Sequence, residues 1–536
     1  MMLQSLKSNA SPPPPPLHVT DSNACKRWIG QLPLTNVQQA QQAMTAQLQA
    51  LANTPLPAHE RLKILELLKQ PIVFIQSESA KRYAGKAVPL APQETATWNH
   101  TMALWQKLSG NYEQCLKAYR EGDLAIAPHA ALVTMRCLHL IGQMMFDYYR
   151  TYSRMPGTLW RELHELYAFA EQHGFARIRI QDSFSRHDPD SSCAEAYVLA
   201  LLAHLANPYS LSARQLGFAE RWLEKWSSLV GLSPQPPLPG PIPLLAVDLA
   251  RPEGILLAQE MAAQASMRYL DLEPLSKTLR QTINCLKQGQ LPAEQGLGED
   301  AKQPGCENLL MLLYVHWCRA GASRTEEREL AEEPVEVCFG ITAAHRQIGG
   351  REFRQPGELS SREKQDMDTF GFIVRPDHGQ TTHAEPGIES WQLINHSASG
   401  FMCILRQPDA KGRIGHNQLI AVRRRGSKHF RVGMIQWLRM DDGTDLRCGI
   451  RLFPGVPRAI AVRHSNPSPT GPNRYECALL LPEIPAPATP ATLILPPGWF
   501  QNGRFIEMHT DRKQIAKLLN LIEKGSDFDR GSVAVI

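Results

Sequence analysis

The chain has 536 residues, with 57 Lys and Arg against 52 Asp and Glu, and 43% of its residues are hydrophobic. At about 100–200 residues per domain, this length predicts two to four domains, and the composition excludes wholesale disorder, a collagen and a coiled coil. No apolar run approaches the roughly 20 residues that span a bilayer, and no apolar core of a secretory signal follows the N-terminus. We therefore expect a cytoplasmic protein without a membrane span.

The cysteine and histidine patterns indicate neither a disulfide framework nor a metal centre. The 11 cysteines are scattered without a CxxC pair, whereas such sites need clustered spacing. We expect them to be reduced and mostly buried. His378 and His383 flank a polar loop, where solvent-exposed histidines explain them better than a metal site does. We expect no cofactor and no metal.

The N-terminal part of the chain predicts a tail followed by helices. Residues 1–20 contain Pro12–Pro16 and no periodic apolar face, so we expect a disordered proline-rich tail. Residues 21–232 show the spacing of apolar residues that is typical of helices. One predicted helix begins near Pro57 and ends at Pro71, because proline cannot donate the backbone hydrogen bond of a helix interior.

Two helix starts in this domain carry capping signals. Ser192 is followed three residues later by Glu195, and Ser212 is followed by Gln215. In a capping box the hydroxyl accepts a bond from the backbone N–H three residues on, while the longer side chain reaches back. We therefore expect helices to begin directly after both serines.

A proline-rich stretch separates this domain from the rest of the chain. Ser233–Pro243 predicts a linker, and we assign residues 233–317 to a linker and a mixed segment. An extended piece is expected near Leu244–Leu249, and helices around Leu275–Lys287 and Asn308–Cys318.

Beyond this segment the pattern changes to short, alternating or β-branched runs at intervals of about ten residues. The expected strands are Pro334–Phe339, Ser390–Ile394, Phe401–Arg406, Gln418–Arg424, His429–Met440, Leu446–Phe453 and Arg458–Arg463. Asp441, Asp442 and Gly443 predict a hairpin turn. These runs indicate an antiparallel barrel or sandwich over residues 318–464, with a polar insertion at about 342–389. Residues 465–536 predict a small β extension.

The small net charge of +5 hides a basic region. Residues 401–464 hold 13 basic and four acidic side chains, a local net charge of +9. Such a region indicates an anionic partner. Arg423, Arg424 and Arg425 lie in it on an expected strand; they either hold phosphates or solvate an edge strand, and we assign them no site.

No enzyme signature is present: we find no Walker loop, GxGxxG, HExxH or GxSxG, and no nucleophile beside a base. Two other motifs carry binding chemistry. Arg324 and Arg328 form an RxxxR before an expected strand, and Asn395, Ser397 and Gly400 form an NxSxxG between two strands. Arginine stacks on purines and pairs bidentately with guanine or phosphate. Amide and hydroxyl groups can bind a base edge and phosphate oxygens, and glycine permits close approach.

This pair of motifs, in this order, resembles the PilZ domain, a β-barrel receptor for the bacterial second messenger cyclic di-GMP. In that family the arginine motif lies just before the first strand and wraps over the dinucleotide, and the [D/N]xSxxG lies beside it on the barrel. The resemblance covers about residues 318–464 and includes His429–Leu438 and Leu446–Phe453. It implies an α+β chain: a helical N-terminal domain, a PilZ-like six-stranded antiparallel β-barrel and a small β extension.

The resemblance also implies residue roles and a function. Arg324 and Arg328 would stack on and pair with guanines and phosphates; Asn395 and Ser397 would bind a guanine edge and phosphate, and Gly400 would allow close approach. The chain would be a cyclic di-GMP receptor, not an enzyme, that couples ligand binding to a protein partner of the helical domain.

Several departures from the family pattern keep alternatives open. The insertion lengthens the interval between the motifs, Glu326 and Glu327 weaken the positive potential of the arginine motif, and Asn395 stands where Asp is common. The arginines could be a solvated helix end, and the NxSxxG a turn chosen for backbone geometry.

Two other functions compete with the receptor hypothesis. One is a helical scaffold protein with a degenerate, non-binding PilZ module used for protein contacts. The other is nucleic-acid binding through the basic region, which we consider unlikely because only Phe430 and Trp437 could form an aromatic platform there.

Overall fold

The structure is a computed structural model. It describes residues 17–181, 190–258, 264–319, 327–356, 369, 387–406, 412–441, 445–465, 474–485, 489–510 and 512–536. Most of the expected tail, and also His378 and His383, lie outside these residues. The chain divides into two compact units, the first Met1–Lys86 with Leu90–Ser323 and the second Ala87–Pro89 with Arg324–Ile536.

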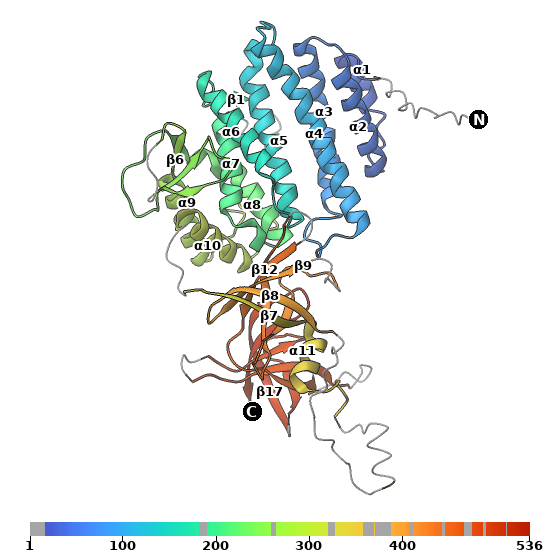
Figure 1. Cartoon of the computed structure of the whole chain (residues 1–536), viewed down its shortest axis with the longest axis vertical. Coiled ribbons are helices and arrows are strands. Elements are labelled where there is room, and N and C mark those ends of the chain that lie inside the picture. The colour runs from blue at the N-terminus through green and yellow to red at the C-terminus, as the bar shows by residue number, and fades with distance from the viewer. Residues whose placement is uncertain are drawn as a thin grey trace, which may run out of the picture. The chain divides into compact units, whose positions relative to one another are not determined.

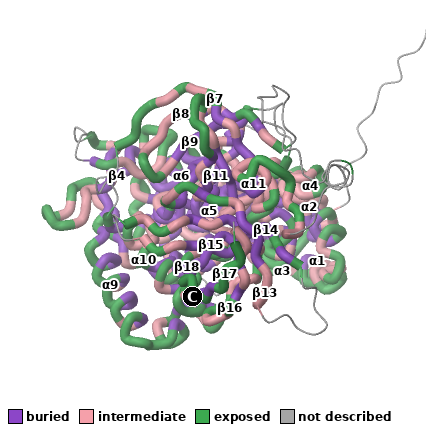
Figure 2. Tube along the Cα trace, turned by 90° about the horizontal axis from the view of Figure 1, so that it is seen from below, coloured by how far each residue is buried: buried purple, intermediate pink, exposed green. Residues whose placement is uncertain are grey.

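The first unit is helical, and most of its consecutive helices pack side by side (Figure 1). The helices are α1 (Ser22–Ile29), α2 (Val37–Asn53), α3 (Ala58–Ala80), α4 (Pro92–Arg120), α5 (Ala130–Arg150), α6 (Gly157–Gln172), α7 (Cys193–Leu205), α8 (Ala213–Trp226), α9 (Glu273–Lys287) and α10 (Gly305–Cys318). Their apolar faces share one core, to which α5 contributes many buried residues, and Figure 2 shows buried and exposed residues alternating along α9.

Both expected capping signals are confirmed. The Ser192 hydroxyl accepts a bond from the Glu195 N–H at 3.2 Å, and the Ser212 hydroxyl accepts one from the Gln215 N–H at 3.3 Å. The Gln215 side chain also accepts a bond from the Ser212 N–H at 2.9 Å, which completes the capping box. These bonds satisfy N–H groups that have no partner inside the helix.

The predicted helix end at Pro71 is wrong, because α3 continues through it to Ala80. Pro71 is buried, and Ile72 and Ile75 on the following turn are fully buried in the core. The apolar area buried beyond the proline therefore outweighs the one backbone bond that the proline removes.

The segment at 233–317, expected as a linker and mixed piece, is part of the first unit. It contains the expected extended piece and two helices, and a small sheet in the order β3-β6-β4-β5. Its strands are β3 (Gly231–Ser233), β4 (Leu245–Asp248), β5 (Leu256–Leu257) and β6 (Met267–Asp271); β1 (Ile180–Gln181) and β2 (Asp190–Ser191) pair separately. Leu279 of α9 and Trp317 of α10 lie in the main helical core, since their apolar faces need burial.

The second unit contains two closed barrels of six antiparallel strands each. In the first, the strand order is β10-β11-β12-β9-β8-β7. Its strands are β7 (Glu329–Phe339), β8 (Glu389–His396), β9 (Gly400–Arg406), β10 (Leu419–Arg424), β11 (Arg431–Asp441) and β12 (Asp445–Leu452). This barrel confirms the six-stranded antiparallel fold. The strands around the predicted hairpin turn pair as expected, with Asp441 opposite Asp445, although Asp442 and Gly443 lie outside the described residues.

The second barrel corrects the expected small β extension. Its order is β13-β14-β15-β18-β17-β16. Its strands are β13 (Arg458–His464), β14 (Glu476–Leu481), β15 (Thr492–Leu495), β16 (Phe505–His509), β17 (Lys513–Lys524) and β18 (Asp529–Val535). The domain boundary that the sequence predicted at residue 464 therefore falls after β13, within the second barrel. The sequence did not predict these strands because β17 is rich in helix-forming residues and prolines surround β15. Pairing with neighbouring strands, and not local propensity, makes both segments extended.

The two barrels share a core. Phe453, which follows β12, packs with Phe528 near β18, and the cluster also contains Leu479 and Ile494 of the second barrel. Helix α11 (Gly340–Gly349), at the start of the predicted insertion, contacts strands of both barrels. The two barrels are therefore joined by apolar packing and not only by the chain.

Two expectations from composition can be compared with the described residues. All 11 cysteines are free thiols, and all but Cys285 are buried, as predicted. Among the helices that the structure describes, none has the length and apolarity to cross a membrane.

Candidate functional site

The predicted NxSxxG motif forms the turn between β8 and β9. The Ser397 N–H donates to the Gly400 carbonyl at 2.8 Å, and the Leu452 N–H donates to the Ser399 carbonyl at 2.8 Å, which ties the turn to the end of β12. A Cβ added at Gly400 would lie 3.2 Å from the Ile450 carbonyl oxygen. The glycine therefore permits a close approach of two strands.

Arg328 of the arginine motif and the turn come together at one end of the first barrel. Strand β7 pairs with β8 so that Leu330 lies opposite Asn395, and the exposed Arg328 directly precedes β7. Arg328 Nη1 donates to Asn395 Oδ1 at 3.0 Å, across 67 residues of sequence. The Asn395 amide nitrogen in turn contacts Met402 Sδ at 3.4 Å, which directs its oxygen toward the arginine.

Of the five predicted site residues, the structure therefore brings four together: Arg328, Asn395, Ser397 and Gly400. Arg324 lies outside the described residues, so its place relative to the turn stays a prediction.

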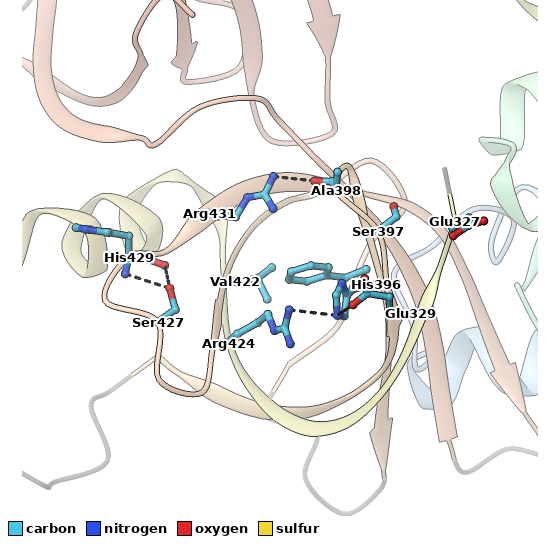
Figure 3. A pocket seen from close by; sticks show the side chains of 11 residues that line it. Glu327, Glu329, His396, Ser397, Ala398, Val422, Arg424, Ser427, His429 and Arg431 are labelled. Atoms are coloured by element: carbon cyan, nitrogen blue, oxygen red, sulfur yellow. Dashed lines mark hydrogen bonds and ion pairs between the residues drawn. The ribbon is translucent and has the colours of Figure 1, made fainter. Parts of the chain in front are cut away.

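A pocket of about 340 Å³ opens beside the turn, at one end of the first barrel. It is lined by Glu327, Glu329, His396, Ser397, Ala398, Phe401, Val422, Arg424, Ser427, His429 and Arg431. In Figure 3, Val422, Arg424 and His396 project into the ring of strands, and Ser397 and Ala398 lie at its rim. The pocket thus presents cationic, hydroxyl and aromatic groups to one space.

Carboxylates of β7 balance part of this positive charge. Arg424 Nε lies 2.5 Å from Glu333 Oε1, and Arg424 Nη1 lies 3.2 Å from His396 Nε2. His396 Nε2 is also 3.5 Å from Glu329 Oε2. The same nitrogen accepts a bond from Arg424 only when it is unprotonated and donates to Glu329 only when it is protonated, so the two contacts exclude each other.

The other arginines of the predicted triplet contribute less to the pocket. Arg423 Nε lies 2.6 Å from Glu336 Oε2, and its guanidinium lies 4.6 Å from the centre of the Phe430 ring. Arg425 is exposed and does not line the pocket.

Arg431 is a pocket residue that the motif search did not identify. It begins β11 opposite Val422, and its Nη2 donates to the Ala398 carbonyl at 3.0 Å. Burial lowers the pKa of this half-buried guanidinium. The only signal in the sequence was its place at the start of an expected strand within the basic region.

No group of three or more His, Cys, Asp or Glu side chains is arranged to hold a metal ion in the parts of the chain that the structure covers. A second pocket, of about 590 Å³, lies among α4, α5 and α6 of the helical unit. It has apolar side chains such as Met144 and three carboxylates, Glu113, Glu162 and Glu165. Burial and the two neighbouring carboxylates raise the pKa of Glu162. No motif of the sequence falls in this pocket.

Comparison with known proteins finds matches at both ends of the chain. Residues 23–237 match the family model described as cyclic-di-GMP receptor FimW, N-terminal domain, and residues 460–533 match the FimW C-terminal beta-barrel domain. The relative named cyclic-di-GMP receptor FimW, from Pseudomonas aeruginosa, is 23% identical over 545 residues, which cover 92% of this chain and 87% of the relative. The second barrel coincides with the C-terminal match, and the first barrel lies between the two matched ranges.

Proposed function

We propose that this chain is a cyclic di-GMP receptor whose ligand site is one end of the first barrel, at the start of β7 and the β8–β9 turn. The observation that carries the proposal is the bond from Arg328 to Asn395, which joins the two motifs of the sequence in one place. The receptor name of the FimW relative supports the ligand. We further propose that the first barrel is of the PilZ type and that the chain acts by binding, without catalysis.

The chemistry of the four assembled residues suits a guanine dinucleotide. An exposed guanidinium can stack on a purine and donate to guanine O6 and N7 or to a phosphate. Arg328 is held beside the turn through its bond to the neutral amide of Asn395, whereas Arg423 and Arg424 lie at ion-pair distance from carboxylates. Ser397 adds a hydroxyl at the pocket, and Gly400 keeps the turn close to β12.

The place of the arginine motif suggests how binding is transmitted. The boundary between the two units falls between Ser323 and Arg324, at the start of this motif. We propose that the ligand fixes the segment from Arg324 to Arg328 against the turn and so changes how the helical unit meets a protein partner. That partner and a cytoplasmic location stay predictions.

Calorimetric titration of the intact chain with cyclic di-GMP tests the proposal. We expect saturable binding by the wild type and a loss of at least about tenfold in affinity for Arg324→Ala/Arg328→Ala, because charge-assisted bonds contribute about 1.5–3 kcal/mol each. Arg458→Ala, which removes an exposed arginine of the second barrel, is the matched control and should bind like the wild type. Unchanged affinity in the double variant would overturn the site.

A second candidate function is a scaffold with a non-binding barrel. The carboxylates of Glu327 and Glu329 line the pocket and would repel a dianionic ligand, which favours this alternative. Failure of the wild type to bind cyclic di-GMP at micromolar concentration would support it. Nucleic-acid binding is disfavoured because Phe430, one of the two candidate stacking residues, is only 4% exposed and lies under Arg423.

A further inference from the structure

Arg431 is held at the pocket in an unusual electrostatic setting. Its guanidinium is half-buried, and within the described residues its recorded partner is the neutral Ala398 carbonyl, with no carboxylate at ion-pair distance. Withdrawing a guanidinium from water costs free energy that a neutral carbonyl offsets only partly. Burial lowers the pKa of Arg431 for the same reason, because it disfavours the charged form of the guanidinium.

Other arginines of the two barrels have charged partners. Among the described strand residues, seven of them contact carboxylates: Arg423, Arg424, Arg439, Arg447, Arg451, Arg463 and Arg530. Carboxylates are thus available to strand arginines throughout the second unit. Arg431, which lines the pocket, instead donates to a neutral carbonyl oxygen.

The pocket places this cation beside the predicted binding turn. Arg431 and Ser397 both line it, and Figure 3 shows Arg431 reaching the turn at Ala398, next to Ser397. One Nη2 bond is used by the carbonyl, so the remaining N–H groups of the guanidinium are available to a ligand. Because Arg431 begins a barrel strand, its backbone is fixed before a ligand arrives.

We propose that this pocket is a phosphate subsite of the receptor, in which Arg431 binds a phosphodiester of the ligand together with the Ser397 hydroxyl. The inference rests on the proposed cyclic di-GMP function and adds a binding residue that lies outside both sequence motifs. A phosphate is the expected group, because an anion supplies an opposite charge to the half-buried guanidinium, whereas a neutral base edge does not.

Three substitutions at Arg431 separate charge from support of the turn. Arg431→Ala removes both. Arg431→Gln keeps N–H donors for the Ala398 carbonyl but removes the charge, and Arg431→Lys keeps the charge without the planar fork. Arg425→Ala is the matched control, because Arg425 is an exposed arginine that directly follows β10 and does not line the pocket. Cyclic di-GMP affinity of the full chain is measured by calorimetry at low and high salt, after thermal unfolding shows which variants are folded.

We expect Arg431→Ala and Arg431→Gln to bind about 10- to 100-fold more weakly than the wild type, and Arg431→Lys to fall between them and the wild type. Both neutral variants should also lose less affinity than the wild type when salt is added, because one screened attraction is gone. Arg425→Ala should match the wild type in affinity.

Wild-type affinity in Arg431→Gln would overturn the inference by showing that the residue only supports the turn, and this readout remains if Arg431→Ala does not fold. A wild type that binds no cyclic di-GMP would overturn the proposed function, and this subsite with it. A wild type that binds and an Arg431→Gln variant that binds equally well would remove the subsite alone.

Discussion

The two barrels of the second unit have the same number of strands and the same antiparallel pairing, yet their surfaces differ. The first carries the two sequence motifs and a pocket at one end, where Arg328 and Arg431 donate to neutral oxygens. In the second, Arg463 pairs with Glu507, and Arg530 with Glu523, at 2.7 and 3.1 Å. The fold is therefore shared, and the proposed binding function depends on a few residues at the end of one barrel.

The comparison also shows where the barrels are not separate. Arg451 of β12 contacts Glu523 of β17, and the same carboxylate holds Arg530 of β18. Together with the shared apolar cluster, this network predicts that the barrels unfold as one body, although we propose a ligand site in the first alone. The predictions below test both parts of this statement, from the largest expected effect to the smallest.

The largest effect is expected at Phe453, which is fully buried between the barrels. Phe453→Ala should lower the free energy of unfolding by about 3–5 kcal/mol, because it leaves a cavity in the common core. Urea unfolding followed by tryptophan fluorescence measures the change. Phe505→Ala, at a side chain that is 46% exposed on β16, is the control and should cost much less. Separate transitions for the two barrels would contradict the shared core.

The second prediction concerns the contact between Arg328 and Asn395. Arg328→Ala should weaken cyclic di-GMP binding about 10- to 100-fold, and Asn395→Ala should weaken it less. The double variant should be less affected than the sum of the two single changes, because both side chains act in one bonded pair. Full additivity in this cycle, measured by calorimetry, would show that the bond has no part in binding.

The third prediction tests the close strand packing of the first barrel. A Cβ at Gly433 would clash with the Arg451 carbonyl oxygen, which belongs to the paired backbone and cannot move aside easily. Gly433→Ala should therefore destabilise the chain by about 1–3 kcal/mol. Gly412→Ala is the control, since no atom lies within 4 Å of the added Cβ. Equal urea midpoints for the two variants would show that β11 and β12 can move apart to accommodate the added methyl group.

The smallest effect is a pH dependence at Asp527, which lies just before β18. Burial raises the pKa of Asp527, although its Oδ1 accepts a bond from the Leu419 N–H of the first barrel at 2.8 Å. The folded state thus holds the proton more tightly, so this group's stabilising contribution is present below the ordinary pKa of 3.8 and is lost as pH rises through the raised value.

Asp527→Asn keeps an amide oxygen for the Leu419 N–H and removes the titration. At neutral pH the variant should be at least as stable as the wild type, and this advantage should shrink as the solution becomes acidic. Thermal midpoints across that pH range provide the check. A variant that is less stable than the wild type at neutral pH would show that the charged carboxylate is favourable there.

Much of the first barrel and its turn could be predicted from the sequence, because the information is local. Alternating runs define strands, and the NxSxxG spacing places Ser397 and Gly400 in a turn. The second barrel could not be predicted in full. Strand β17 has the composition of a helix, and only its pairing with β16 and β18 makes it a strand.

The difference between local patterns and strand pairing also explains which site residues could be predicted. Arg328 and Asn395 could be predicted because each lies in a motif, but their contact depends on the register of β7 on β8. Arg431 belongs to no motif. Its proposed role follows from the lack of a carboxylate at ion-pair distance among the described residues, and a single sequence does not reveal this because it does not state which strands are neighbours.

The central claim is that the first barrel, and not the second, is the receptor for cyclic di-GMP. Calorimetric titration of the intact chain tests it most directly when Arg328→Ala is compared with Arg458→Ala. We predict saturable binding by the wild type and by Arg458→Ala, and affinity that is at least about tenfold weaker in Arg328→Ala. Equal affinity in all three proteins, or a loss confined to Arg458→Ala, would contradict the claim.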